Sequence, residues 1–216
     1  MIRQKKDSNV PKSLSTTKSY GRDDVQRQLM EDQHDKCYIC ERIRKTDCEI
    51  EHLKSQSNHK ELTQEWNNLF MSCGYCNRKK SSDYDEIVNP LTIDVEDVIK
   101  QEFDFPNNKA KFTSLTTADT SVEKTIELLN VIYNGTKKCR KFREEQFIKE
   151  IRNIISSFCK MTSDYLDNPN EENREAIIAD LSIDQEALGF KYWIIKSKPE
   201  LEKTFANYIV WNKTKG

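Results

Sequence analysis

Two pairs of cysteines constrain this chain more than any other feature of its sequence. Cys37 and Cys40 form the first CxxC pair, and Cys73 and Cys76 form the second, with residues 41–72 between them. A tight turn brings both sulfurs of such a pair to one side, and four thiolates complete a tetrahedral structural zinc site. We therefore predict that a zinc ion organises this part of the chain.

The alternative for these four residues is a redox or packing role. The chain holds seven cysteines, and we interpret the other three, Cys48, Cys139 and Cys159, as buried thiols. Two CxxC pairs are hard to obtain by chance in a chain this poor in cysteine, which favours the metal site.

The composition favours a helix-rich protein. One third of the residues are charged, 36% are apolar, and glycine and proline are scarce, a balance that argues against a barrel or a sandwich. The formal net charge is −1, so any affinity for nucleic acid has to come from local clusters of charge. The basic start lacks an apolar signal segment and no stretch has the length of a membrane span, so we expect a cytoplasmic protein without a membrane partner.

Charge and apolar spacing divide the chain into three parts. We expect a flexible basic segment at residues 1–21, a zinc-stabilised unit with a flanking helix and a hairpin at 22–115, and a helical extension at 116–216. The helical extension is a candidate for binding a partner. The local patterns predict a helix over Asp23–Gln33, a hairpin over 98–113, a capping box at Thr120 and Glu123, and a helix break at Asn168-Pro169.

The segment between the cysteine pairs carries groups suited to phosphodiester cleavage. Glu51 and His52 are adjacent, and Asn77 follows the last cysteine directly. Neutral imidazole is a general base near pH 7, and the oxygens of Glu51 and Asn77 suit Mg²⁺. The cations that come next, Arg78, Lys79 and Lys80, suit phosphate.

These residues together resemble the HNH endonucleases of the zinc-bearing, four-cysteine type. The resemblance rests on the CxxC pairs, on IEH at 50–52, on Asn68-Leu69, and on Asn77 with Lys80. It implies a mainly α protein with a small ββα-metal core. In that core His52 would be the general base and Asn68 would brace the loop that carries it. Glu51 and Asn77 would hold a catalytic Mg²⁺ or Mn²⁺, with the zinc as scaffold.

A narrower resemblance covers residues 22 to about 150. CYICER, IEHLKSQS, WNNLFMSCGYCNRKKS and TIELLN look like the HNH subunit of Septu-type anti-phage defence systems (PtuB-type). This implies an ABC/SMC-like ATPase subunit (PtuA-type) as partner and, for retron-linked members, a retron reverse transcriptase with its RNA–DNA product. The substrate would be DNA, or tRNA in a retron-linked member.

The chain departs from the family pattern at Glu51, where Asp is common, and at Ser55, where a proline is expected. A different class of function also fits the residues. In that alternative the four cysteines fold a zinc-stabilised nucleic-acid-binding or adaptor module, and the adjacent Glu51 and His52 have no catalytic role.

Overall fold

Helices dominate the computed structural model, which describes residues 1–17, 19–137 and 140–213. Cys139 therefore lies outside the described residues. The helices are α1 (Lys12–Thr16), α2 (Asp23–Asp32), α3 (Gly74–Lys80), α4 (Val95–Val98), α5 (Thr120–Asn134), α6 (Phe142–Asp167), α7 (Glu171–Asp180), α8 (Leu188–Lys196) and α9 (Pro199–Phe205). Short 3₁₀ turns lie at Lys60–Leu62, Trp66–Asn68, Ser81–Tyr84 and Ala206–Tyr208.

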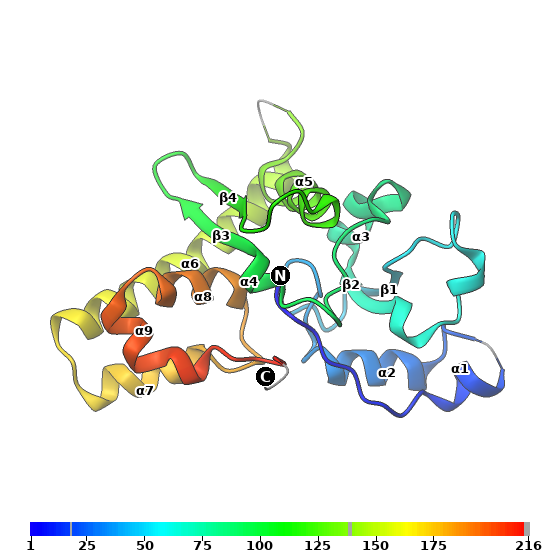
Figure 1. Ribbon diagram of the computed structural model, residues 1–216, viewed down its shortest axis with the longest axis horizontal. Helices are drawn as coiled ribbons and strands as arrows, with labels where there is room; N and C mark the ends of the chain where they lie inside the picture. The colour runs from blue at the N-terminus through cyan, green and yellow to red at the C-terminus, as the bar shows by residue number, and fades with distance from the viewer. Residues whose placement is uncertain (18, 138–139, 214–216) are drawn as a thin grey trace.

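The strands form two antiparallel pairs. β1 (Cys48–His52) pairs with β2 (Leu69–Cys73) so that His52 lies opposite Leu69, and α3 follows β2 directly. β3 (Ile99–Asp104) pairs with β4 (Lys109–Ser114), which confirms the predicted hairpin. In Figure 1 the β1–β2 pair and α3 lie at one end of the molecule, while α7 and α9 lie at the other.

The predicted helix limits hold with one correction. α2 covers Asp23–Asp32, and α6 ends at Asp167, before the Asn168-Pro169 break. The capping box at Thr120 is wrong, because Asp119 is the N-cap of α5. Its carboxylate accepts hydrogen bonds from Ser121 N at 2.9 Å and from Val122 N at 3.2 Å. Aspartate is among the strongest N-capping residues, so the helix begins at Thr120 rather than after it.

The main hydrophobic core crosses the expected boundary between residues 115 and 116. It joins the four paired cysteines to apolar side chains of β4, α5 and α6. Tyr75, between the second pair of cysteines, stacks on Phe147 of α6 with ring centroids 4.8 Å apart. The Tyr133 hydroxyl of α5 donates to the Cys40 carbonyl at 3.4 Å. The first two helices of the extension are therefore packed on the cysteine-bearing unit.

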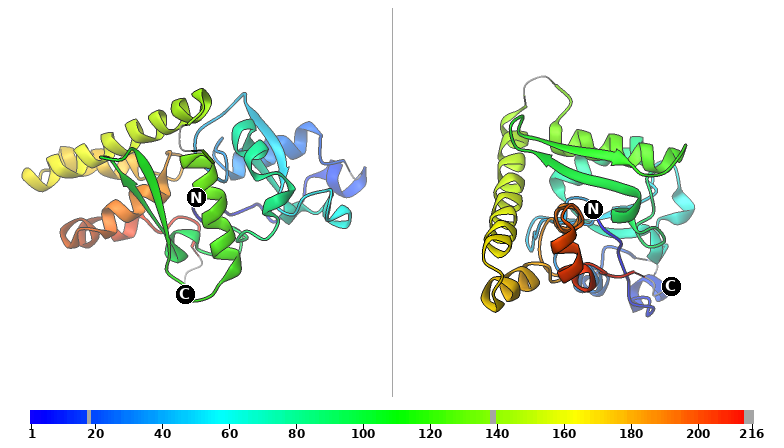
Figure 2. Two further views of the ribbon diagram at one scale, coloured as in Figure 1. Left: turned by 90° about the horizontal axis from the view of Figure 1, so that it is seen from above. Right: turned by 60° about the vertical axis from the view of Figure 1, so that its left-hand side comes forward.

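A second cluster of buried side chains holds the last helices together. It gathers Phe158 of α6, Ile177 of α7, Leu188 and Ile195 of α8, and Leu201 and Phe205 of α9. Figure 2 shows α6 as the long helix that runs from the centre of the molecule to this end. α6 therefore connects the two clusters.

The N-terminal segment is packed, although its composition predicted flexibility. Ile2 and Leu14 are buried, and the Lys6 ammonium lies over the rings of Trp66 and Phe70, 4.4 Å and 4.3 Å from their centroids. The same ammonium donates to the carbonyls of Trp66 and Leu69. Composition is misleading here because a few apolar residues, Met1, Ile2 and Leu14, are buried and hold the segment in place, although Val10 is exposed.

Glu96 of α4 provides a test of this packing. Its carboxyl group is fully buried, and one oxygen accepts from Arg3 N at 2.8 Å, while the other has no partner among the described residues. Burial raises the pKa of Glu96 to about 7. Between about pH 4.5 and pH 7 the unfolded chain loses this proton and the folded chain keeps it, so stability falls as pH rises through this window.

We expect this loss of stability with rising pH to be absent in Glu96→Gln. The change in the free energy of unfolding from pH 5 to pH 8 should therefore be more favourable in the variant than in the wild type by up to about 3 kcal/mol. Urea unfolding of both proteins at the two pH values measures the difference. Glu65→Gln, at an exposed glutamate, is the control. An unchanged pH dependence in Glu96→Gln would contradict the assignment.

Candidate metal centre and active site

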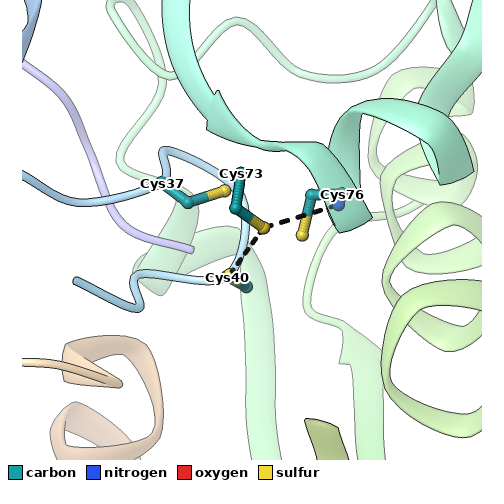
Figure 3. A group of neighbouring side chains, drawn as sticks. All are labelled: Cys37, Cys40, Cys73 and Cys76. Atoms are coloured by element: carbon teal, nitrogen blue, oxygen red, sulfur yellow. Dashed lines mark hydrogen bonds between the residues drawn. The ribbon is translucent and has the colours of Figure 1, made fainter. Parts of the chain in front are cut away.

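The four paired cysteines meet at one point in the core. Their sulfur atoms all lie within 4.8 Å of one another, and all four side chains are buried. Zinc bonded to sulfur at about 2.3 Å in a tetrahedron requires sulfur atoms about 3.8 Å apart. The Cys40 and Cys73 sulfurs are 4.0 Å apart, and Figure 3 shows the four side chains converging. The arrangement fits a structural zinc ion.

The local structure explains how the sulfurs are presented. Cys73 ends β2 and is the N-cap of α3, where its sulfur accepts from Cys76 N at 3.5 Å. Burial raises the pKa of the Cys40 and Cys76 thiols, so a cation among them is needed to hold these groups as thiolates. The other described cysteines, Cys48 and Cys159, lie outside the cluster.

His52 ends β1 and is held by the loop that follows. Its ring is buried, with Nε2 3.0 Å from the Thr63 carbonyl. Because a carbonyl can only accept, this contact places the proton on Nε2 and leaves the lone pair on Nδ1. The Gln56 amide nitrogen lies 3.1 Å from Nε2 and 3.3 Å from Nδ1, and with this tautomer it can donate to Nδ1. The Tyr20 ring meets the imidazole edge-on, with ring centroids 4.8 Å apart. Burial lowers the pKa of His52, which keeps the ring neutral at pH 7.

Asn68 braces the loop after β1. Its side-chain oxygen accepts from Lys54 N at 2.8 Å, and its amide donates to the carbonyls of Lys54 and Leu62 at 3.0 Å and 3.1 Å. The adjacent Asn67 is exposed. Asn68, and not the exposed Asn67, therefore makes the hydrogen bonds that hold this loop.

Both carboxylate oxygens of Glu51 have partners. One accepts from the Tyr38 hydroxyl at 2.6 Å and the other faces the Lys80 ammonium at 2.8 Å. Burial raises the pKa of Glu51, while Lys80 and the Tyr38 hydroxyl act in the opposite direction. Glu51 is thus a fixed, buried group at the base of the site.

Asn77 lies on α3, close to β1. Its amide donates to a carboxylate oxygen of Glu49 at 2.5 Å. Glu51, His52 and Asn77 line one groove of about 380 Å³ together with serines of the neighbouring loops. Glu49 was not identified from the sequence. It lies two residues before Glu51 on β1 and therefore on the same face of the strand.

The three cations after Asn77 have different environments. Arg78 is exposed, and Lys79 is paired with Glu144 of α6 at 2.5 Å. Lys80 has no exposed surface, and besides Glu51 it donates to the His52 carbonyl at 2.9 Å. A phosphate contact by Lys80 is therefore a wrong prediction, because no phosphate can reach a buried ammonium that is already paired.

Asp85 is a structural residue of the site that the sequence did not single out. Its carboxylate accepts from Ser55 N at 2.8 Å, from the Ser55 hydroxyl at 2.7 Å and from Asn58 at 2.8 Å. Ser55 stands where a proline was expected. These hydrogen bonds fix the loop that a proline ring would otherwise stiffen. In the sequence, Asp85 is one of several acidic residues between positions 83 and 104, and no local pattern distinguishes it from the others.

Comparison with known proteins places this site in a family domain. Residues 37–83 match the family model described as HNH endonuclease. The matched segment contains both cysteine pairs, β1, β2 and α3. Searches of the curated proteins and of the solved structures give no significant match. The segment 37–83 is thus similar to HNH endonucleases and contains a four-cysteine cluster that could bind zinc.

Loss of one cysteine of the cluster should disrupt the core itself. Structural zinc contributes about 10–16 kcal/mol to the folding of small modules. We expect Cys40→Ser to reduce bound zinc, measured by plasma mass spectrometry, and to lower the unfolding temperature sharply. Cys48→Ser and Cys159→Ser should retain one zinc per chain. Full zinc content in Cys40→Ser would count against the centre.

Proposed function

We propose that this chain is a metal-dependent HNH endonuclease subunit that hydrolyses phosphodiester bonds in nucleic acid. The observation that carries the proposal is His52, a buried neutral imidazole that is held by the Thr63 carbonyl and lines one groove together with Glu51 and Asn77. The family match over residues 37–83 supports it. β1, β2 and α3 would form the ββα-metal core.

The residues present fit a hard divalent cation. Mg²⁺ is usually held by one or two carboxylates with substrate phosphate and water, and here Glu51 and Asn77 would supply the protein oxygens. When bound, Mg²⁺ or Mn²⁺ supplies charge stabilisation at the phosphoryl and leaving oxygens.

Residues of the chain itself would perform the other steps of the reaction. His52 Nδ1 accepts a proton from the attacking water, and the Thr63 carbonyl stabilises the imidazolium that forms by accepting from Nε2. Asn68 and Asp85 hold the loop segments on either side, so the ring keeps its orientation during turnover. Arg78 is exposed on α3 and would contact phosphate near the cleaved bond.

The biological setting is proposed from the sequence resemblance. The chain would be the effector of a bacterial anti-phage defence complex in the cytoplasm, with an ABC/SMC-like ATPase of the PtuA type and, in a retron-linked system, a reverse transcriptase and its RNA–DNA product. None of the described helices is long and apolar enough to cross a membrane. Co-purification after co-expression with such an ATPase tests this setting.

Replacing the general base should stop cleavage without unfolding the protein. A general base contributes about 10²–10⁴-fold to a rate, so we expect His52→Asn to lose activity by that factor while its zinc content and unfolding temperature remain. His34→Asn carries the same change at an exposed histidine and should stay active.

The assay uses plasmid DNA, phage DNA and total tRNA with Mg²⁺, which also identifies the substrate. Full activity in His52→Asn would overturn the mechanism. If the wild-type protein, alone and in complex with the ATPase, binds nucleic acid but does not cleave it, this result would favour the alternative function, a non-catalytic zinc-stabilised adaptor module.

Arg78 should contribute one phosphate contact. Each neutralised phosphate adds about 0.7–0.9 to the slope of log affinity against log salt concentration. We therefore expect Arg78→Gln to weaken binding and to reduce that slope by about one. Fluorescence anisotropy over a salt series measures it, with Lys203→Gln, an exposed residue on α9, as the control. Equal slopes for wild type and Arg78→Gln would remove Arg78 from the interface.

A further inference from the structure

Each of the two CxxC turns contains one tyrosine, and the two hydroxyls point to different places. Tyr75 donates to the Ile132 carbonyl of α5 at 2.8 Å. Tyr38 donates to Glu51 at 2.6 Å. One turn of the cysteine cluster is thus hydrogen-bonded to the candidate catalytic carboxylate, and the other is hydrogen-bonded to a structural helix.

We propose that Tyr38, together with Lys80, is a positioning residue that holds Glu51 for the second metal ion, so that the zinc centre sets the geometry of the catalytic metal site. This inference rests on the proposed nuclease function. It gives the first CxxC turn a role in the chemistry in addition to its role in folding.

The Tyr38 hydroxyl has a fixed position. The side chain has no exposed surface, and its ring stacks on Phe70 with centroids 4.7 Å apart. Phe70 is the residue directly opposite Glu51 in the β1–β2 ladder. The Tyr38 amide donates to the Met71 carbonyl of β2 at 3.1 Å, and the preceding residue is the cluster ligand Cys37. Neither the ring nor the backbone of Tyr38 can shift without disturbing the cluster or β2.

Lys80 completes a two-point clamp. It contacts the second oxygen of Glu51 at 2.8 Å and the carbonyl of the next residue, His52, at 2.9 Å. One ammonium therefore fixes both the carboxylate and the backbone of the general base. Its charge also opposes a nearby cation, so removing Lys80 changes orientation and charge together. Tyr38 is the cleaner residue to test.

The clamp leaves Glu51 able to bind a metal ion. A carboxylate has about four lone-pair positions, and Tyr38 and Lys80 occupy one on each oxygen. The others would be available to a cation. Groups that hydrogen-bond to a metal ligand typically change metal affinity or activity by about 10–100-fold when removed.

Tyr38→Phe removes only the hydroxyl and keeps the ring on Phe70. Tyr75→Phe makes the same change in the other CxxC turn, and Glu51→Gln removes the charge of the metal ligand. Binding of Mn²⁺ to the zinc-loaded proteins, measured by electron paramagnetic resonance, gives a readout independent of cleavage. We expect binding about 10–100-fold weaker in Tyr38→Phe, unchanged binding in Tyr75→Phe, and loss of binding in Glu51→Gln.

Cleavage gives the second readout. Tyr38→Phe should need a higher Mg²⁺ concentration for half-maximal rate and should recover its rate at saturating Mg²⁺. A loss of rate that saturating Mg²⁺ does not restore would overturn the proposal. Wild-type Mn²⁺ affinity in Tyr38→Phe, with binding lost in Glu51→Gln, would overturn the positioning role and leave the nuclease proposal intact. Wild-type affinity in Glu51→Gln would overturn both the clamp and the metal site.

Discussion

The rest of the structure depends on four cysteine side chains that meet in one buried place. The two CxxC turns come from segments far apart in the chain, and the cluster holds the loop before β1 against the junction of β2 and α3. The hairpin and helices α5 and α6 pack on those turns through aromatic rings such as Tyr133 and Phe147. A short antiparallel pair of strands is only marginally stable alone, so the cluster and this packing are what make the candidate site rigid.

A buried network of charges adds orientation to that rigidity. Lys80 lies between Glu51 and Asp85, and it also binds the His52 carbonyl. Buried ion pairs contribute little net stability because desolvation opposes their attraction, but they are sensitive to geometry. The network therefore accounts for the position of the loop after β1 better than for the stability of the fold. Its members come from β1, α3 and the turn after α3, which are the elements that border the groove.

Short sequence patterns predicted those features of the fold that depend on neighbouring residues in the chain. The cysteine spacing, the β3–β4 hairpin, helix α2 and the break at Asn168-Pro169 are each visible within a short window, and each is present. The burial of Lys80, the role of Asp85 and the packing of Lys6 depend on contacts between distant segments. A lysine after a cysteine pair has the same sequence signal whether it faces phosphate or a buried carboxylate. Only the fold distinguishes the two.

The different environments of the three cations also bear on how a nucleic acid would be held. Lys80 is buried and Lys79 is paired with Glu144, so of the three only Arg78 is exposed. Proteins that bind duplex DNA tightly neutralise about 6–10 phosphates, and a chain with a net charge of −1 has little general attraction for a polyanion. In the proposed nuclease, most of the binding energy would then come from outside the groove. The proposed partner subunit would supply it by presenting the nucleic acid to His52, and cleavage would then occur only where that partner is engaged.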